Sequence, residues 1–262
     1  MSSHLDVRLR EGTKHSHTIT ENTAFMKCFL KGVVEKSYFR KLLADLYFVY
    51  GALEEQLEWY QHHPIIGMIY FPELRRQANL EKDLAFYYGE NWRSQIVPSP
   101  AGQVYVNRIR EVGNTQPELL IAHAYTRYMG DLSGGQALRK IARTAMDLPS
   151  DLGTAMLEFE QISTPEARRE FKEQYRQALN FLPLEEAMIQ NIVNEANYAF
   201  TLNRNVIHEL EADVKAVIGE HVFDLITRQD HIGSTEHTPK SATAEIIAPE
   251  YSLMMTQKSP LK

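Results

Sequence analysis

The stretch LLIAHAYTRYMGDLSGGQALRKIA, from Leu119 to Ala142, decides the fold of this chain. Its apolar residues recur at helical spacing on both sides of three glycines, Gly130, Gly134 and Gly135. A glycine inside a helix costs about 1 kcal/mol relative to alanine, so the three together weaken the segment by roughly 3 kcal/mol. A helix that keeps such residues has a use for bare backbone.

Four small residues of this segment fall on one helical stripe. Gly130, Ser133, Gly134 and Ala137 stand at i, i+3, i+4 and i+7, so a straight helix presents them as a surface almost free of side chains. Two interpretations are open: a flat ligand lies on the stripe, or a second helix approaches closely, which is the commoner use of small residues.

Polar residues border the same stripe. Arg127 and Asp131 are spaced i, i+4, which places a fork of hydrogen-bond donors beside a carboxylate. Reactive groups next to bare backbone favour a binding site over simple helix packing.

Helical spacing dominates the rest of the 262 residues, and no series of alternating strands or internal repeats stands out. We therefore predict an all-α fold, with one helical domain over residues 1–228 and a polar, poorly ordered tail over residues 229–262. Pro239, Pro249 and Pro260 interrupt a Ser/Thr-rich stretch in that tail.

The capping and breaking residues give approximate helix bounds. We predict a turn at Pro98–Gly102. Besides the glycine-bearing stretch, we predict helices over about Val7–Thr23, Leu80–Tyr88, Val104–Val112, Leu184–Val217 and Glu220–Thr227. Two more helices begin after the N-caps Ser37 and Thr164, and these continue through Leu57 and up to Pro183, respectively.

Composition narrows the function classes. No apolar run approaches the roughly 18 residues that cross a bilayer, and no secretory stretch opens the chain, so we predict a cytoplasmic protein without a membrane anchor. The single Cys28 excludes an internal disulfide and a cysteine cluster for a metal.

The formal net charge of −6 argues against nucleic-acid binding, although the charge is unevenly distributed. Between Arg8 and Lys41, eight cations exceed three acids by five. A basic end on an acidic protein suits an anionic ligand or an acidic partner, and a solvated charged face is the ordinary alternative.

One histidine near the start of the chain has small helical neighbours. Thr13, Ser16 and Thr20 stand at i−4, i−1 and i+3 from His17, so a planar group can reach the imidazole. Glu21 at i+4 can accept a hydrogen bond from the other ring nitrogen, as the partner of a metal-binding histidine does. A half-exposed histidine on a basic helix is the plainer explanation.

Two further observations bear on this region. Thr18 and Glu21 fit a capping box, which would give the glutamate a purely structural role if a helix began there. Cationic pairs at i, i+4 occur at Arg10 with Lys14 and at Lys172 with Arg176. A planar, dianionic iron macrocycle requires cations for its carboxylates, a ligand for its iron and a flat surface. The sequence offers two cationic pairs, a histidine and a stripe free of large side chains.

Four stretches in order resemble heme oxygenase: HTITENTAFMKCFLKG, LYFVYGALEEQLE, YFPELRRQANLEKDLAFYYG and AHAYTRYMGDLSGGQ. The resemblance runs from about Leu5 to His221. It implies an all-helical fold with heme held between a proximal helix and a glycine-kinked distal helix.

The resemblance assigns roles residue by residue. His17 matches the proximal iron ligand, and Asp131 matches the carboxylate that organises distal water. Glu21 matches the partner of that histidine, and Gly135 supports the kink of the distal helix. The distal network also includes matches at Tyr50 and Arg127. The other matched cofactor-binding positions are Arg10, Lys14, Tyr125, Gly130, Gly134, Lys172, Arg176, Phe200 and Asn203. Met129 stands where several relatives carry leucine.

By the same resemblance, heme b is both substrate and cofactor, and the products are biliverdin IXα, ferrous iron and carbon monoxide. Oxygen and an external electron donor are required, because the chain has no flavin or nicotinamide fingerprint. The lack of a hydrophobic anchor resembles soluble bacterial, cyanobacterial and plastid forms, whose donor is typically the acidic protein ferredoxin.

Three alternatives compete with this interpretation. A heme carrier or sensor would share the ligand without needing Asp131. A helical interaction protein would use the small-residue stripe for packing. A ferritin-like di-iron bundle fails, because no Glu-x-x-His occurs in the sequence.

Overall fold

The structure is a computed structural model, and it describes residues 4–235. That part of the chain is helical and contains no strand, which confirms the predicted all-α class. Its α-helices are α1 Leu5–Glu21, α2 Ala24–Leu30, α3 Lys36–Trp59, α4 Gln77–Tyr88, α5 Pro100–Thr115, α6 Leu120–Ala124, α7 Gly130–Ala145, α8 Pro165–Phe181, α9 Glu186–His208, α10 Glu211–Ile218 and α11 Glu220–Thr227.

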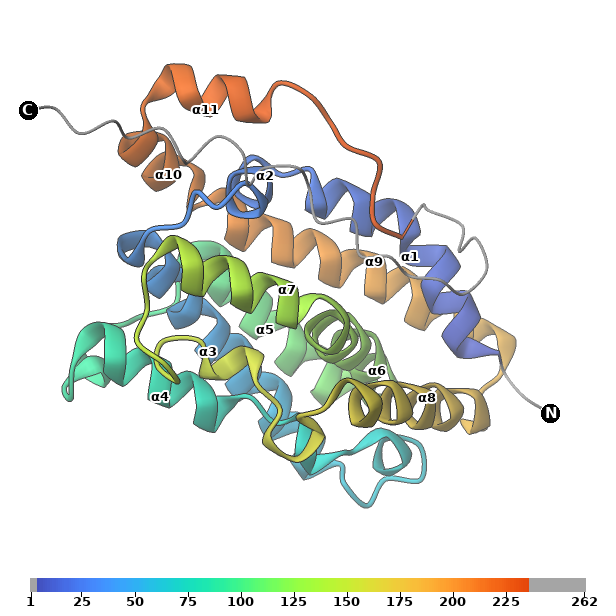
Figure 1. Cartoon of the computed structure of the whole chain (residues 1–262). Helices are drawn as coiled ribbons and strands as arrows, with labels where there is room; N and C mark the ends of the chain where they lie inside the picture. The colour runs from blue at the N-terminus through green and yellow to red at the C-terminus, as the bar shows by residue number, and fades with distance from the viewer. Residues whose placement is uncertain (1–3, 236–262) are drawn as a thin grey trace, which may run out of the picture.

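The long helices α3, α5 and α9 form the centre of the molecule (Figure 1). α1 and α6 pack against α9, and α4 packs against α3. Helix α3 is buried along much of its length because apolar residues recur through all of it, including Leu43, Val49, Leu53 and Leu57. This centre holds the helices that carry the predicted site residues.

The glycine-bearing segment is helical throughout but is not one straight helix. Between α6 and α7 lies a π-helical turn, Tyr125–Met129. Such turns insert an extra residue into a helix and often occur at functional sites. The turn ends where Gly130 begins α7, so the predicted kink lies just before the glycines.

The predicted helix Leu184–Val217 is wrong, because the chain breaks between α9 and α10. The amide of Leu210 bonds the Ile207 carbonyl at 3.1 Å, which closes the last turn of α9 tightly. The Glu209 carboxylate accepts a hydrogen bond from the Ala101 amide at 3.0 Å, at the start of α5. Apolar spacing continues through Leu210 and Val214, so the pattern conceals this break.

Other boundaries also differ from prediction. Helix α1 begins and ends two residues earlier than expected. Helix α3 begins at Lys36, so Ser37 lies inside the helix and is not its cap. The turn predicted around Pro100 is the start of α5, where the Ser99 hydroxyl accepts from the Gly102 amide at 3.0 Å. Thr164 caps α8 as predicted.

The first residues of the predicted tail are described. Residues 229–234 follow α11 and contact the end of α1. Residues 236–262 lie outside the described part, so the prediction for them stays a prediction. No helix within residues 4–235 is long and apolar enough to cross a membrane.

Candidate active site

A hydrogen-bond network joins four helical elements around the predicted distal carboxylate. The Tyr50 phenol on α3 donates to Asp131 on α7. Arg127, in the π-helical turn, donates from Nε to the Tyr50 oxygen at 3.2 Å and from Nη1 to the Asn203 side-chain oxygen at 2.7 Å. All four residues were predicted on the sequence, and the structure brings them together.

Burial governs the charges in this network. Tyr50 is fully buried and Asp131 is 9% exposed. Burial raises the pKa of Asp131 above its usual value, while the nearby Arg127 charge and the Tyr50 hydrogen bond oppose that rise. Burial also raises the pKa of Tyr50 far above its usual range, so the phenol stays a donor. Asp131 is thus a buried acid whose affinity for a proton is increased.

The glycines of α7 face two different environments. A Cβ added to Gly130 or to Gly134 would meet no atom of the described chain within 4 Å. A Cβ on Gly135 would lie 3.6 Å from the Leu157 side chain, in ordinary contact. The first two glycines therefore present bare backbone to open space, whereas Gly135 packs against the rest of the protein. This arrangement fits a flat ligand on the Gly130–Gly134 side of α7.

His17 lies on the inner side of α1, partly exposed. Its Nδ1 atom is buried without a hydrogen bond in the described chain, and it is 3.6 Å from the Glu21 carboxylate. Burial disfavours the charge of Glu21, but His17 and the hydrogen bonds from Ser234 hold the pKa of this carboxyl below its usual value. Because α1 continues to Glu21, the capping-box alternative for Thr18 is wrong.

Helix α9 links the histidine to the distal network. The Phe200 ring meets the His17 ring edge-to-face, with centroids 5.8 Å apart. Three residues further along the same helix, Asn203 accepts the hydrogen bond from Arg127. Residues at i and i+3 share one face of a helix, so α9 presents this face to both halves of the candidate site.

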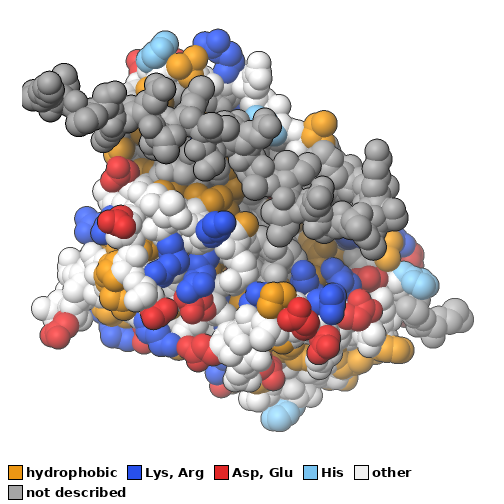
Figure 2. All heavy atoms as spheres, in the orientation of Figure 1, with side chains coloured by type: hydrophobic (Ala, Val, Ile, Leu, Met, Phe, Trp, Pro, Cys, Tyr) orange, Lys and Arg blue, Asp and Glu red, His pale blue; other side chains and the backbone are white. Residues whose placement is uncertain are grey.

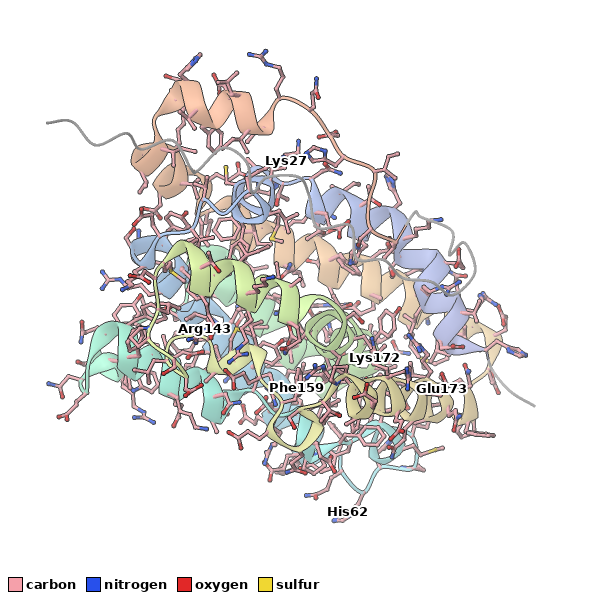
Figure 3. The ribbon with its side chains drawn as sticks, viewed as in Figure 1. Lys27, His62, Arg143, Phe159, Lys172 and Glu173 are labelled. Atoms are coloured by element: carbon pink, nitrogen blue, oxygen red, sulfur yellow. The ribbon has the colours of Figure 1, made fainter. Side chains whose placement is uncertain are left out.

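Positive charge gathers between α1, α8 and the π-helical turn. Burial raises the pKa of Tyr125 to about 12, and the charges of Arg176 and Arg10 oppose that rise, so both cations lie near the phenol. Lys172, labelled on α8 in Figure 3, has a pKa lowered by burial and by Arg176. Neither Lys14 nor Lys172 forms an ion pair within residues 4–235. Two arginines beside a phenol, together with lysines that have no acidic partner in the described chain, fit the carboxylates of a ligand.

Two of the residues predicted to bind heme also contact acids nearby. Arg10 bonds Glu11 at 2.9 Å, and Arg176 lies 3.6 Å from Glu173. Both pairs are solvent-exposed, so they cost little to rearrange.

The basic excess near the start of the chain is partly neutralised in the fold. Ion pairs join four of its eight cations to acids: Arg8 with Glu186, Arg10 with Glu11, Lys27 with Asp230 and Lys41 with Asp213. On the face shown in Figure 2, Lys and Arg side chains lie interspersed with Asp and Glu. The linear count therefore overstates the positive surface.

The structure also shows a buried ionic cluster that the sequence analysis missed. Glu195, on α9, receives two hydrogen bonds from Arg108 and lies 2.9 Å from the fully buried His123. Hydrogen bonds from Arg108 and His123 outweigh burial and hold the pKa of Glu195 at about 2. The signal was available, since Glu195 is a charged residue on a face of α9 otherwise made of Ile192, Ala196 and Ala199.

The fold and site define an all-helical protein in which a kinked, glycine-bearing helix with a buried carboxylate stands near a helix that carries a partly exposed histidine. The sequence profile of the heme oxygenase family matches residues 3–209. The chain belongs to this family.

Relatives agree in sequence and in structure. Heme oxygenase 2 of Synechocystis sp. is 58% identical over 234 residues, which are 89% of this chain and 94% of that protein. Heme oxygenase 1 of Nostoc sp. is 54% identical over 94% of this chain and 100% of its own length. The crystal structure of heme oxygenase-2 from Synechocystis in complex with heme and NO has a TM-score of 0.89 and 57% identity, covering 90% of this chain and 97% of that one.

Proposed function

We propose that this protein opens heme b at the α-meso carbon to give biliverdin IXα, ferrous iron and carbon monoxide. Heme is both the substrate and the cofactor, and when bound it supplies the iron at which oxygen is activated. Oxygen and electrons from a separate reductant complete the reaction. The buried Tyr50–Asp131–Arg127–Asn203 network is the observation that carries the proposal.

His17 is the proposed iron ligand. Its Nδ1 atom faces the Glu21 carboxylate, which leaves Nε2 as the nitrogen available to a metal. A carboxylate near the other ring nitrogen fixes the tautomer that a ligand needs. Support for this role comes from the contact of His17 with Phe200, which connects it to the helix face that reaches the distal network.

Gly130 and Gly134 form the proposed distal floor. Their open surroundings allow main-chain atoms to lie flat against the heme, where any side chain would hold it off. Backbone close to most of the ring leaves one meso edge accessible, so steric shape directs the attack. Gly135 lies on the side of α7 that packs against Leu157, so it supports the position of the helix and does not face the heme.

Asp131 is the proposed proton donor, acting through water. Its raised pKa makes the carboxyl a better proton source near neutral pH than an exposed aspartate. Tyr50 and Arg127 hold the carboxylate in place, and Asn203 holds Arg127. A carrier or sensor of heme would not need this arrangement, and no observation favours that alternative.

The cations Arg10, Lys14, Lys172 and Arg176, with Tyr125, are the proposed partners of the heme propionates. Charged hydrogen bonds to carboxylates are among the strongest that side chains form. The pair Arg10 and Lys14 and the pair Lys172 and Arg176 would therefore fix the rotation of heme about the iron axis. The electrostatic proximity of Arg10 and Arg176 to Tyr125 supports a shared anion site.

The electron donor we propose is ferredoxin or a similar acidic redox protein, and we propose a cytoplasmic location. Basic residues in the first part of the chain that form no ion pair with the described residues, such as Lys14 and Lys36, would attract such a partner. Turnover with ferredoxin should fall as ionic strength rises. Salt-insensitive turnover would contradict electrostatic docking.

The direct test supplies the purified protein with hemin, oxygen and a reducing system. Chromatography of the linear tetrapyrrole then distinguishes the IXα isomer from the other three biliverdins. We expect the IXα isomer alone, with release of carbon monoxide measured in the same reaction. Bound heme that is never opened would support the carrier alternative.

A further inference from the structure

The chain that follows α11 continues away from α10 and descends to lie beside α1 (Figure 1). This returning segment, residues 228–234, contacts the part of α1 and the loop after it that lie closest to His17 and Glu21. Its contacts are specific and polar.

Lys27, labelled in Figure 3, anchors the start of the returning segment. Its ammonium donates to the Thr227 carbonyl at 2.9 Å and to the Asp230 carboxylate at 2.6 Å, and its side chain is only 4% exposed. Asn22 then pairs with the backbone of His231 in both directions, at 2.8 and 2.7 Å. These bonds fix both the position and the register of the segment.

Gly233 allows the segment to lie directly on α1. A Cβ at this position would collide with the Thr18 hydroxyl. Thr18 is one residue from His17, so the segment passes over the helix turn that carries the proposed ligand.

Ser234 ends the segment at the Glu21 carboxylate. Its amide donates to Oε2 at 2.8 Å and its hydroxyl donates to Oε1 at 2.5 Å. Both carboxylate oxygens are therefore engaged, and Oε2 is also the oxygen that lies 3.6 Å from His17 Nδ1. Within residues 4–235, the buried Nδ1 atom of His17 has no hydrogen-bond partner.

A carboxylate that accepts a hydrogen bond from a metal-bound histidine makes the imidazole a stronger electron donor. Donors on the far side of the carboxylate share its negative charge and fix its direction, so they weaken that effect. Ser234 supplies two such donors.

We propose that Ser234 is a positioning residue, which acts through Glu21 to set how strongly His17 donates to the heme iron. This inference rests on the proposed function, because it needs His17 as the ligand. The returning segment thereby couples the end of the helical domain to the electronic state of the heme.

The test uses full-length protein loaded with hemin and reduced to the ferrous state. Resonance Raman spectroscopy measures the iron–histidine stretching frequency, and a spectroelectrochemical titration measures the ferric/ferrous midpoint potential. Ser234→Ala removes the hydroxyl donor to Oε1 of Glu21 and keeps the amide donor to Oε2. The carboxylate then carries more negative charge toward His17, so the frequency should shift upward and the potential to more negative values. Ser234→Thr keeps a hydroxyl and should restore the wild-type values.

Three further variants separate positioning from general loosening. Gly233→Val displaces the segment and should shift both values in the same direction as Ser234→Ala. Glu21→Gln should shift them in the opposite direction, since an amide oxygen is a weaker acceptor than a carboxylate. Asp230→Asn weakens the Lys27 anchor without touching Glu21, and Asn22 still holds the segment, so both values should shift in the same direction as in Ser234→Ala but by less.

The outcomes distinguish this inference from the proposed function. If His17→Ala loses the iron–histidine band but Ser234→Ala keeps wild-type values, the ligand assignment holds and the positioning role is wrong. The positioning role is also wrong if Asp230→Asn shifts the values as far as Ser234→Ala does. If His17→Ala retains the band, both proposals fail.

Discussion

The phenol of Tyr50, on α3, donates a hydrogen bond to the carboxylate of Asp131, on α7. The bond joins the central helix of the fold to the helix that carries the glycines. A buried phenol with a strongly raised pKa cannot take over the negative charge, so it orients the carboxyl group and leaves the proton chemistry to Asp131.

Replacing Asp131 by alanine should separate binding from chemistry. We expect hemin to bind with an unchanged absorption spectrum of the Soret region, while biliverdin formation falls by about 100- to 10,000-fold, the usual range for loss of a positioned proton donor. Lys140→Ala, on the exposed side of α7, is the matched control and should keep full activity. Equal activity in Asp131→Ala and wild type would contradict the proposed role.

The glycines of α7 should show opposite effects on stability and on function. In the absence of heme, Gly130→Ala should raise the unfolding free energy by roughly 1 kcal/mol, because alanine favours the helix and its Cβ meets only open space. The same methyl group should weaken hemin binding, which a spectroscopic titration measures. Thermal unfolding of the two proteins without heme provides the stability comparison.

Gly135→Ala is the control for this prediction. Its Cβ lies 3.6 Å from Leu157, away from the open side, so hemin affinity should change little. If Gly130→Ala and Gly135→Ala affected hemin binding equally, the open side of α7 would not be the ligand side.

The sequence predicted the helices more reliably than their ends. Apolar spacing indicates a helix through Leu210 and Val214, yet the chain turns at Glu209 because its carboxylate bonds the distant Ala101 amide. Spacing carries no information on such a contact between residues far apart in the chain. The pattern of prolines and glycine around Pro100 predicts a turn, although Ser99 and Pro100 also form a standard cap and first helical position.

The site was predicted in the same uneven way. Helical spacing alone predicts that Arg127 lies beside Asp131. In the structure, Nη2 of Arg127 is 3.9 Å from Oδ1 of Asp131. Tyr50 and Asn203 join them from other helices, and only the family resemblance pointed to those two. The bonds of Ser234 to Glu21 span 213 residues of sequence, which no local pattern could reveal.

The cations of α8 should determine both affinity and product identity. Lys172→Ala should raise the hemin dissociation constant by about 10- to 100-fold, the range expected for loss of one charged hydrogen bond, and the effect should diminish at high salt. Because rotation of heme is then less restricted, biliverdin isomers other than IXα should appear on chromatography. Arg169→Ala removes an equal charge from an exposed position of α8 and should change neither property.

Glu195 should make protein stability dependent on acid pH. Its folded pKa of about 2 lies below the ordinary value of 4.5, so the carboxylate contributes stability that is complete above about pH 4.5 and is lost as the pH falls toward 2.

Glu195→Gln leaves Arg108 and the buried His123 without their charged partner, which should lower the unfolding free energy by about 3–5 kcal/mol near neutral pH. Denaturant unfolding of both proteins, near neutral pH and near pH 3.5, should show this difference shrink by about 1 kcal/mol at the lower pH. Glu111→Gln removes an exposed partner of the same arginine and should cost no more than about 1 kcal/mol. A difference that stayed constant across this pH range would show that packing, and not the charge of Glu195, stabilises the cluster.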